Sequence, residues 1–202
     1  CHIVPSIVQD SNTSSLALCE DSFSELMRYL QSNVEAVVIA SRWTMRLYPV
    51  KGYIEELNFN NGEGGTEYNP YRQYSVFKPD GSLSLDADSK RQGIIDFLRE
   101  FDKLPIPVAL IYPIPELGWD IAKENFHARA MLESISTSKQ LYLDRNAFVL
   151  DIFDSFESNN IIKIPVEYMF CVEGRCYGQK NSVPLYYDDD HLSSEGAKLI
   201  VQ

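Results

Sequence analysis

A short acidic segment near the end of the chain carries the residues best suited to chemistry. Asp188 stands three residues before His191, just ahead of a stretch that predicts a C-terminal helix. In a tight loop this spacing lets the Asp188 carboxylate reach one ring nitrogen of His191 and fix its tautomer, so that the other nitrogen can accept a proton. Asp188 and His191 would then be two members of a hydrolytic triad that also needs a serine. The same string fits a solvated acidic loop in which Ser193 caps the following helix.

The composition of the chain excludes some classes of partner. Its 202 residues, 45% of them hydrophobic, suit one domain with a sizeable core. Eighteen basic and 29 acidic side chains give a net charge of −11, which argues against nucleic acid as a partner. No apolar run approaches the roughly 18 residues of a membrane helix. The chain starts at Cys1 without a Met or a signal peptide, so we expect a fragment or a processed form.

Four cysteines bear on the compartment: Cys1, Cys19, Cys171 and Cys176, which could pair in three ways. Proximity in the sequence favours Cys1–Cys19 and Cys171–Cys176, and Gly174 gives the second loop the freedom to turn. A zinc site is the alternative, but neither the cysteine spacing nor the histidines fit one. We therefore expect two disulfides, no metal and an oxidising compartment such as the periplasm.

The apolar pattern predicts alternating helices and strands. The predicted helices cover about residues 21–31, 86–103, 119–132 and 138–156, and the predicted strands cover 34–40, 106–112 and 161–165. This alternation predicts an α/β fold, a three-layer doubly wound parallel sheet with helices on both faces. Residues 49–84 break the rhythm, so we expect an irregular insertion with a hairpin around Asp80-Gly81. It could serve as a lid or partner surface, or be a plain surface excursion.

In such a sheet the chemistry gathers at the carboxyl ends of the strands. Ser41, Arg42 and Trp43 leave the first predicted strand at that edge, and the segment from Pro113 to Trp119 leaves the second. We expect both segments to converge with the loop that carries Asp188 and His191.

Four local features together carry a resemblance to a known family. They are Val37-Val38-Ile39-Ala40-Ser41-Arg42-Trp43, the segment from Tyr112 to Trp119, the paired cysteines near the end, and the segment from Tyr187 to Ser193 followed by Gly196-Ala197. In order and spacing they resemble the SGNH-hydrolase superfamily, specifically the extracytoplasmic SGNH domain fused to membrane acyltransferases of family 3, the O-acetyltransferases of surface polysaccharides. The resemblance runs from Cys1 to Gln202 as one N-terminally truncated SGNH-like domain, although residues 49–84 match poorly.

The chain departs from the family at the nucleophile. The family's serine sits in a Gly-Asp-Ser motif after the first strand, and no Gly-Asp-Ser occurs here. The nearest substitute, Ser11 in Gln9-Asp10-Ser11-Asn12, is separated from the strand at 34–40 by only one helix, whereas the family pattern needs another strand in between. The resemblance therefore implies that the serine and the first strand of the sheet lie upstream of Cys1.

A second departure concerns the oxyanion donor. Many family members place an Asn where this chain has Ser41-Arg42-Trp43. Arg42 could donate to a developing oxyanion or hold a sugar or carboxylate. Equally, Arg42 could form a structural ion pair and Trp43 could simply pack.

The resemblance implies O-acyl transfer, with acetyl the expected group, to a cell-surface polysaccharide. His191 would be the general base and Asp188 its orienting partner, and no cofactor is needed. The implied partners are the polysaccharide acceptor, an acyl donor and a membrane acyltransferase domain in the same full-length chain. This places the domain in the periplasm, tethered to the inner membrane. A free-standing periplasmic carbohydrate esterase and a non-catalytic glycan-binding domain stay open as alternatives.

Overall fold

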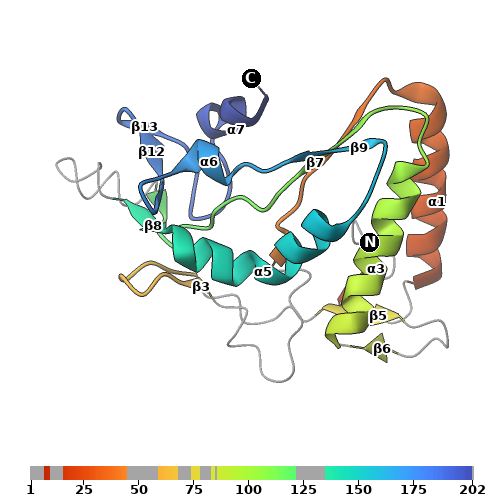
Figure 1. Ribbon diagram of the computed structural model, residues 1–202, viewed down its shortest axis with the longest axis horizontal. Helices are drawn as coiled ribbons and strands as arrows, with labels where there is room; N and C mark the ends of the chain where they lie inside the picture. The colour runs from red at the N-terminus through yellow and green to blue at the C-terminus, as the bar shows by residue number, and fades with distance from the viewer. Residues whose placement is uncertain are drawn as a thin grey trace. The chain divides into compact units, whose positions relative to one another are not determined.

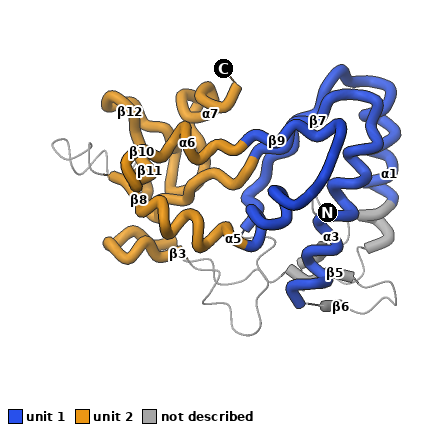
Figure 2. Tube along the Cα trace, in the orientation of Figure 1, with its two compact units in different colours: residues 1–57, 70–111, 148–164 blue, residues 58–69, 112–147, 165–202 orange. Residues whose placement is uncertain are grey.

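The computed structural model describes residues 7–9, 16–44, 59–67, 74–77, 83–84, 86–121 and 135–201. The chain divides into two compact units (Figure 2). Unit 1 comprises Cys1–Leu57, Pro70–Ile111 and Phe148–Ile164, and unit 2 comprises Asn58–Asn69, Tyr112–Ala147 and Pro165–Gln202. The expected single SGNH-like domain over 1–202 stays a prediction.

Unit 1 is built on a three-stranded parallel sheet (Figure 1). Its order is β2 (Val37–Ile39), β7 (Val108–Ile111) and β9 (Ile161–Ile164), and both neighbouring pairs are parallel. The three strands fall within the predicted apolar runs. This confirms the α/β fold class with a parallel sheet and helices.

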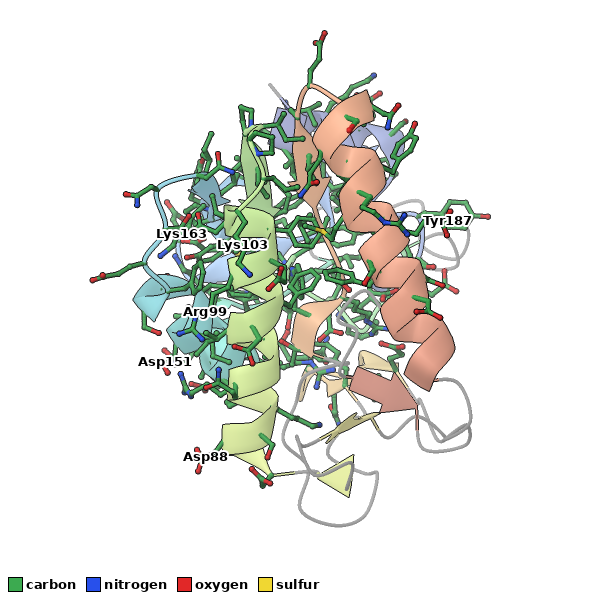
Figure 3. All side chains as sticks on the ribbon, turned by 90° about the vertical axis from the view of Figure 1, so that its right-hand side faces the viewer. Asp88, Arg99, Lys103, Asp151, Lys163 and Tyr187 are labelled. Atoms are coloured by element: carbon green, nitrogen blue, oxygen red, sulfur yellow. A yellow bond between two sulfur atoms is a disulfide. The ribbon has the colours of Figure 1, made fainter. Side chains whose placement is uncertain are left out.

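Two helices connect these strands, α3 (Ala87–Asp102) and α5 (Lys139–Ser155), and α1 (Leu16–Asn33) precedes β2. The chain moves from β2 to β7 to β9 in one direction, so right-handed crossovers place α3 and α5 on the same face of the sheet. The Asp86 side chain caps α3 by accepting a hydrogen bond of 2.7 Å from the Ser89 main-chain N–H. Asp88 and Arg99 on α3, and Lys103 just after it, are exposed (Figure 3).

An aromatic cluster joins the three helices of unit 1. The Phe23 ring of α1 lies 6.1 Å from the rings of Phe97 and Phe101 on α3. Trp43, which follows β2, stands edge-on to Phe153 of α5 at 5.2 Å. The Trp43 side chain is 2% exposed, and its indole N–H donates to the Ile111 carbonyl at 2.9 Å. Trp43 thus ties the end of β2 to the end of β7.

The opposite face of the parallel sheet is open within the described residues of unit 1. Val38, Ala109 and Ile162 lie side by side on it in register. Val38 is 67% exposed and Ile162 is 58% exposed. β1 (Ile7–Gln9) pairs antiparallel with β5 (Tyr74–Phe77), and is therefore not a strand of the parallel sheet.

The predicted hairpin around Asp80-Gly81 is confirmed by pairing on either side of it. β5 pairs antiparallel with β6 (Leu83–Ser84), with Val76 opposite Ser84 and Phe77 opposite Leu83. The turn itself lies outside the described residues, as does most of the predicted helix at 119–132.

Unit 2 consists of short antiparallel pieces and short helices. Its elements are β3 (Phe59–Asn60) with β4 (Thr66–Glu67), the sheet β10 (Cys171–Val172), β11 (Arg175–Tyr177) and β8 (Ser136–Ser138), the pair β12 (Gln179–Lys180) and β13 (Val183–Pro184), α6 (Glu167–Phe170), α7 (Ser194–Val201) and the first turns of α5. Cys171 and Cys176 face each other across β10 and β11 and form the expected disulfide. Within the described ranges, every helix of the chain is too short or too polar to cross a membrane.

We predict that Trp43→Ala destabilises the protein by about 3–5 kcal/mol, because it leaves a cavity in the aromatic cluster. Trp43→Phe should cost less, since it keeps a ring but loses the hydrogen bond to Ile111. Urea unfolding followed by circular dichroism measures both. Tyr29→Ala on α1, where Tyr29 is 56% exposed, is the matched control and should change stability by less than about 0.5 kcal/mol. Equal costs for Trp43→Ala and Tyr29→Ala would contradict the packing role.

Candidate functional site

Asp188 and His191 are in the contact that their spacing predicts. The Nδ1 atom of His191 lies 2.9 Å from Oδ2 and 3.1 Å from Oδ1 of Asp188. Asp188 Oδ1 also accepts main-chain hydrogen bonds from Asp190 at 3.1 Å and from His191 at 2.8 Å. One carboxylate therefore closes the tight loop and engages the imidazole that the loop carries.

Asp190 is a second carboxylate on the same ring nitrogen. Its Oδ1 lies 2.9 Å from His191 Nδ1, and its side chain is 5% exposed, whereas that of His191 is 73% exposed. The sequence analysis did not assign Asp190 a role. The signal was present, since Asp190 lies inside the same acidic string, but the spacing alone favours the residue three positions before the histidine.

This arrangement favours the tautomer in which Nδ1 carries the proton. Carboxylates only accept hydrogen bonds, so two of them at Nδ1 stabilise the Nδ1–H form and, after protonation, the imidazolium. Nε2 is then the basic nitrogen of the ring, and the exposure of His191 lets a substrate approach it.

Burial and hydrogen bonding act in opposite directions on the pKa of Asp188. Partial burial raises it, but hydrogen bonds from the main-chain N–H groups of His191 and Asp190, and from the His191 ring, lower it by more. The pKa of Asp188 is therefore below its ordinary value, and the group is a carboxylate at neutral pH.

Asp188, Asp190 and His191 are also the described residues whose ligand atoms could gather round a metal ion, since these atoms lie within 4.8 Å of one another. The His191 atom on that side is Nδ1, which already contacts both carboxylates. That the site needs no metal stays a prediction.

A short antiparallel pairing of residues 185–187 with residues 191–193 holds the His191 loop at its base. Tyr187 N–H donates to the His191 carbonyl at 2.7 Å, and Ser193 N–H donates to the Leu185 carbonyl at 2.9 Å. The Ser193 hydroxyl accepts from Gly196 N–H at 3.1 Å, as an N-cap of α7 does, and donates to the Pro184 carbonyl at 2.7 Å. The loop therefore has both predicted features: Ser193 caps α7, and Asp188 contacts the His191 ring.

Gly196 is required where α7 begins. A Cβ atom on this residue would stand 2.0 Å from the Leu185 carbonyl oxygen. Only glycine lets α7 pack this closely against Leu185, at the base of the His191 loop.

The segment from Tyr112 to Trp119, which follows β7 in the chain, supports this loop. Leu117 N–H donates to the Asp189 carbonyl at 2.9 Å, so the segment touches the loop directly. Its own carbonyls are held by three side chains: Tyr142 donates to Pro113 at 3.0 Å, Tyr186 to Pro115 at 2.8 Å, and the Asn61 amide to Leu117 at 3.1 Å. Complete burial raises the pKa of Tyr186 well above its ordinary value, so its phenol keeps the proton that it donates.

A buried ion pair fixes the middle of this segment. Arg145 Nε on α5 hydrogen-bonds Glu116 Oε2, and the two side chains are 11% and 7% exposed. The Arg145 guanidinium also lies 5.0 Å from the centre of the Phe59 ring on β3. Glu116 and Arg145 had no role in the sequence analysis, because they lie 29 positions apart.

Residues 59–67 of the predicted insertion also contact the Tyr112–Trp119 segment and β11. The turn between β3 and β4 brings Glu63 to Arg175 of β11, which donates from both terminal nitrogens at 2.6 Å. The hydrogen bond from Arg175 lowers the pKa of Glu63. A Cβ atom on Gly118 would meet the Phe59 ring at 2.8 Å, so β3 also touches the Tyr112–Trp119 segment. Residues 59–67 therefore pack on the rest of unit 2, and the role of the insertion as a lid or partner surface stays a prediction.

The same hairpin places a carboxyl group against the His191 loop. Burial raises the pKa of Asp189 to about 6, and the charge of Glu67 on β4, which shares a hydrogen bond with Asp189, adds to the rise. Two carboxyl groups in contact favour a shared proton at mildly acidic pH.

The predicted site residues Ser41, Arg42 and Trp43 belong to unit 1, whereas Asp188 and His191 belong to unit 2. Ser41 and Arg42 are half-buried at the carboxyl end of β2 in unit 1, and Trp43 packs in the aromatic cluster with its N–H already donated. Trp43 thus takes the packing role left open by the sequence. That Ser41 and Arg42 line one cleft with His191 stays a prediction. Ser11, Cys1 and the side chain of Cys19 lie outside the described residues, so the Cys1–Cys19 disulfide also stays a prediction.

We predict opposite pH dependences for two substitutions in this loop. The raised pKa of Asp189 means that its contribution to stability is full below about pH 4 and is lost as the pH rises through about 6. Asp189→Asn should therefore raise the thermal unfolding midpoint at about pH 8 and change it little at about pH 4.

Asp188→Asn should do the reverse. The lowered pKa of Asp188 stabilises the fold above its ordinary pKa, and this contribution disappears as the pH falls through the lowered value. The variant should lose stability at about pH 8, and the loss should shrink toward about pH 3. The same pH dependence in both variants would refute the assignment of these two carboxyl groups.

We also predict that Arg145→Met destabilises the protein by about 3–5 kcal/mol, because it leaves the Glu116 carboxylate buried without its partner. The double variant Arg145→Met/Glu116→Leu should recover most of that loss, and urea unfolding measures both. Equal stability of the single and double variants would mean that the ion pair does not couple α5 to the segment.

Comparison with known proteins agrees with this description. A model of one family, the SGNH domain (fused to AT3 domains), matches residues 1–202. Neither the curated proteins nor the solved structures include a significant match. Because the family match covers the whole chain, the protein belongs to the family of SGNH domains that are fused to AT3 domains.

Proposed function

We propose that this domain transfers an O-acyl group, in the first instance acetyl, to a cell-surface polysaccharide. Membership of the SGNH family fused to AT3 domains indicates acyl transfer or esterase chemistry in general. The observation that carries the specific proposal is the imidazole of His191, held at Nδ1 by the carboxylates of Asp188 and Asp190. A base in this setting is the central part of a hydrolytic triad.

In the first half of the proposed reaction, a serine hydroxyl attacks the acyl carbonyl of the donor. His191 Nε2 takes the serine proton as the Oγ–C bond forms, and the two carboxylates stabilise the imidazolium. The tetrahedral intermediate then expels the leaving group, which receives that proton from His191. Ser41 and Arg42 are the proposed donors to the oxyanion.

In the second half, a sugar hydroxyl attacks the acyl-serine. His191 accepts the proton of the incoming hydroxyl and returns it to the serine as the acyl group leaves. No Gly-Asp-Ser occurs in residues 1–202, so we place the serine in such a motif upstream of Cys1. Ser193 is a poor substitute, because its hydroxyl is engaged with Pro184 and Gly196.

We propose that the domain works in the periplasm beside a membrane acyltransferase domain of the same full-length chain. The AT3 fusion in the family description supports the membrane partner. The Cys171–Cys176 disulfide supports an oxidising compartment. The donor and the polysaccharide are the substrates, and the steps above need no cofactor.

One observation favours the esterase alternative. The His191 side chain is 73% exposed, so water could attack the acyl-serine in place of a sugar hydroxyl. A domain that only binds glycan is the third candidate, and it would not depend on His191.

The decisive substitution is His191→Ala in the full-length protein. Because His191 moves the proton in both steps, its loss should lower polysaccharide acylation by about 10²- to 10⁴-fold. Acyl release into solution, measured in the same assay, separates transferase from esterase. Circular dichroism should show an unchanged fold, since the ring is exposed. A folded His191→Ala protein that acylated polysaccharide at the parent rate would exclude the triad.

The two carboxylates should share the orienting role. Asp188→Asn and Asp190→Asn should each lower the rate by about tenfold, since one acceptor for Nδ1–H is kept, and the double variant should approach His191→Ala. Lys198→Gln, an exposed change on α7, is the matched control. If Asp190→Asn had no effect while Asp188→Asn alone matched His191→Ala, the shared role would be wrong.

A further inference from the structure

Tyr187 stands opposite His191 at the open end of the pairing that carries the proposed base. Tyr186 and Leu192 form an antiparallel bridge, and next to it the Tyr187 N–H donates to the His191 carbonyl at 2.7 Å. Directly opposite residues of an antiparallel pair point to the same face, with their Cβ atoms about 4.5–5.5 Å apart. Tyr187 is therefore a side-chain neighbour of His191 across the loop.

The exposure of these residues follows the alternation of faces. Tyr186 is 2% exposed, and its hydroxyl donates to the Pro115 carbonyl on the inner face. Tyr187 is 74% exposed and its side chain projects from the ribbon (Figure 3), while the His191 side chain is 73% exposed. Successive side chains of an extended chain point to opposite faces, so the phenol ring of Tyr187 and the imidazole share the outer face.

The position of this ring matters more than its exposure, because single exposed apolar side chains are common on proteins. Asp188 and Asp190 contact Nδ1 of His191, so Nε2 lies on the side of the imidazole away from these carboxylates. A flat ligand that packs on the Tyr187 ring therefore lies next to the imidazole whose Nε2 takes the proton.

The shape of this surface suits a sugar ring. A ligand pocket buries most of its ligand, whereas a ring that is 74% exposed offers one flat apolar face and leaves the far side of the ligand in water. A pyranose has C–H bonds on one face and hydroxyls around its edge, so it can pack on the Tyr187 ring and keep its hydroxyls hydrated. An acyl chain is apolar on every side and would bury only one of them here.

The charges around His191 favour a sugar without a carboxylate. Asp188 is a carboxylate at neutral pH, since its pKa is lowered, and Asp190 contacts the same imidazole. Glu67 and Asp189 add carboxyl groups beside the loop, and the chain has a net charge of −11. A sugar carboxylate placed beside His191 would lie close to Asp188 and Asp190, and physiological salt screens charges only beyond about 8 Å. An acidic sugar is therefore repelled.

We infer that Tyr187 binds the acceptor: an uncharged pyranose unit of the polysaccharide packs on its ring and directs a hydroxyl to His191. The inference deepens the proposed function and rests on it for the identity of the acceptor. Tyr187 positions this hydroxyl and takes no part in the proton transfer.

Binding is tested with the full-length protein and the methyl glycosides of glucose, galactose and glucuronic acid. Ligand-observed saturation-transfer NMR at neutral pH should detect a neutral glycoside at millimolar concentration. The glucuronide should bind more weakly than the glucoside, from which it differs by its carboxylate. Tyr187→Ala should weaken binding of the neutral glycoside about tenfold, because the stacking surface is lost. Tyr187→Phe keeps the ring and should bind within about twofold of the parent.

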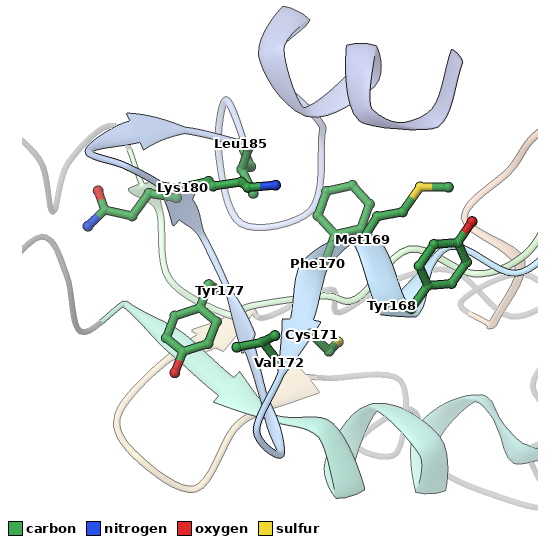
Figure 4. A pocket seen from close by; sticks show the side chains of 9 residues that line it. Tyr168, Met169, Phe170, Cys171, Val172, Tyr177, Lys180 and Leu185 are labelled. Carbon is green, nitrogen blue, oxygen red and sulfur yellow. The ribbon is translucent and has the colours of Figure 1, made fainter. Parts of the chain in front are cut away.

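Tyr168→Ala is the matched control. Tyr168 lies on α6, where it lines a pocket of unit 2 with Met169 and Leu185 (Figure 4), and it is 63% exposed. It matches Tyr187 in type and exposure but is not part of the pairing that carries His191, so its substitution should leave glycoside binding unchanged. Both alanine variants should keep the parent's unfolding midpoint, since both rings are exposed.

A kinetic measurement distinguishes acceptor binding from support of the loop. In polysaccharide acylation, Tyr187→Ala should raise the KM for the acceptor about tenfold and leave acyl release into solution unchanged, because water needs no stacking surface. An equal fall in acyl transfer and acyl release would mean that Tyr187 holds the loop and not the acceptor, which overturns the inference.

The outcomes separate this inference from the proposed function. Acceptor binding by Tyr187 is overturned if no glycoside binds, if Tyr187→Ala binds like the parent, if Tyr187→Phe binds as weakly as Tyr187→Ala, or if the glucuronide binds as tightly as the glucoside. Each of these results holds even where His191→Ala abolishes acyl transfer. Conversely, glycoside binding that depends on the Tyr187 ring, in a protein whose acyl transfer survives His191→Ala, supports acceptor binding and overturns the triad.

Discussion

The contact of His191 Nδ1 with two carboxylates determines what the rest of unit 2 has to hold in place. Asp188 reaches the ring through a tight local loop, whereas Asp190 reaches it from a position that is almost fully buried. A histidine that is largely exposed gains a fixed tautomer in this way without itself being packed. The loop also concentrates negative charge. Asp189, between Asp188 and Asp190, contacts Glu67, and these two carboxyl groups favour a shared proton.

The support beneath this loop is made of hydrogen bonds to main-chain carbonyls. The segment from Tyr112 to Trp119 has no regular secondary structure, so its polar groups need partners from side chains. Tyr142, Tyr186 and Asn61 provide them, and the buried Glu116–Arg145 pair prevents the segment from shifting. These hydrogen bonds are buried, and in a low-dielectric interior they are stronger than in water, so the support beneath the exposed His191 is stiff.

The sequence predicted those features that depend on local spacing. Continuous apolar runs located β2, β7 and β9, the apolar pattern placed a helix over 86–103, where α3 lies, and the three-residue spacing located the Asp188–His191 contact. Pairs of side chains from distant elements could not be found in this way. Glu63 and Arg175 are 112 positions apart, and Trp43 and Ile111 are 68 positions apart. The residues next to Trp43 in the sequence do not indicate whether its indole is buried or binds substrate. That depends on the Ile111 carbonyl, which only the fold brings to the indole N–H.

The most direct test of the central claim is the protonation state of the two His191 ring nitrogens. Long-range ¹H–¹⁵N correlation spectra report it, and the signal of His191 among the three histidines is assigned by its loss in His191→Ala. With Asp188 and Asp190 both at Nδ1, the neutral ring should carry its proton on Nδ1 and present an unprotonated Nε2. A neutral ring protonated on Nε2 would contradict the assignment of His191 as the base.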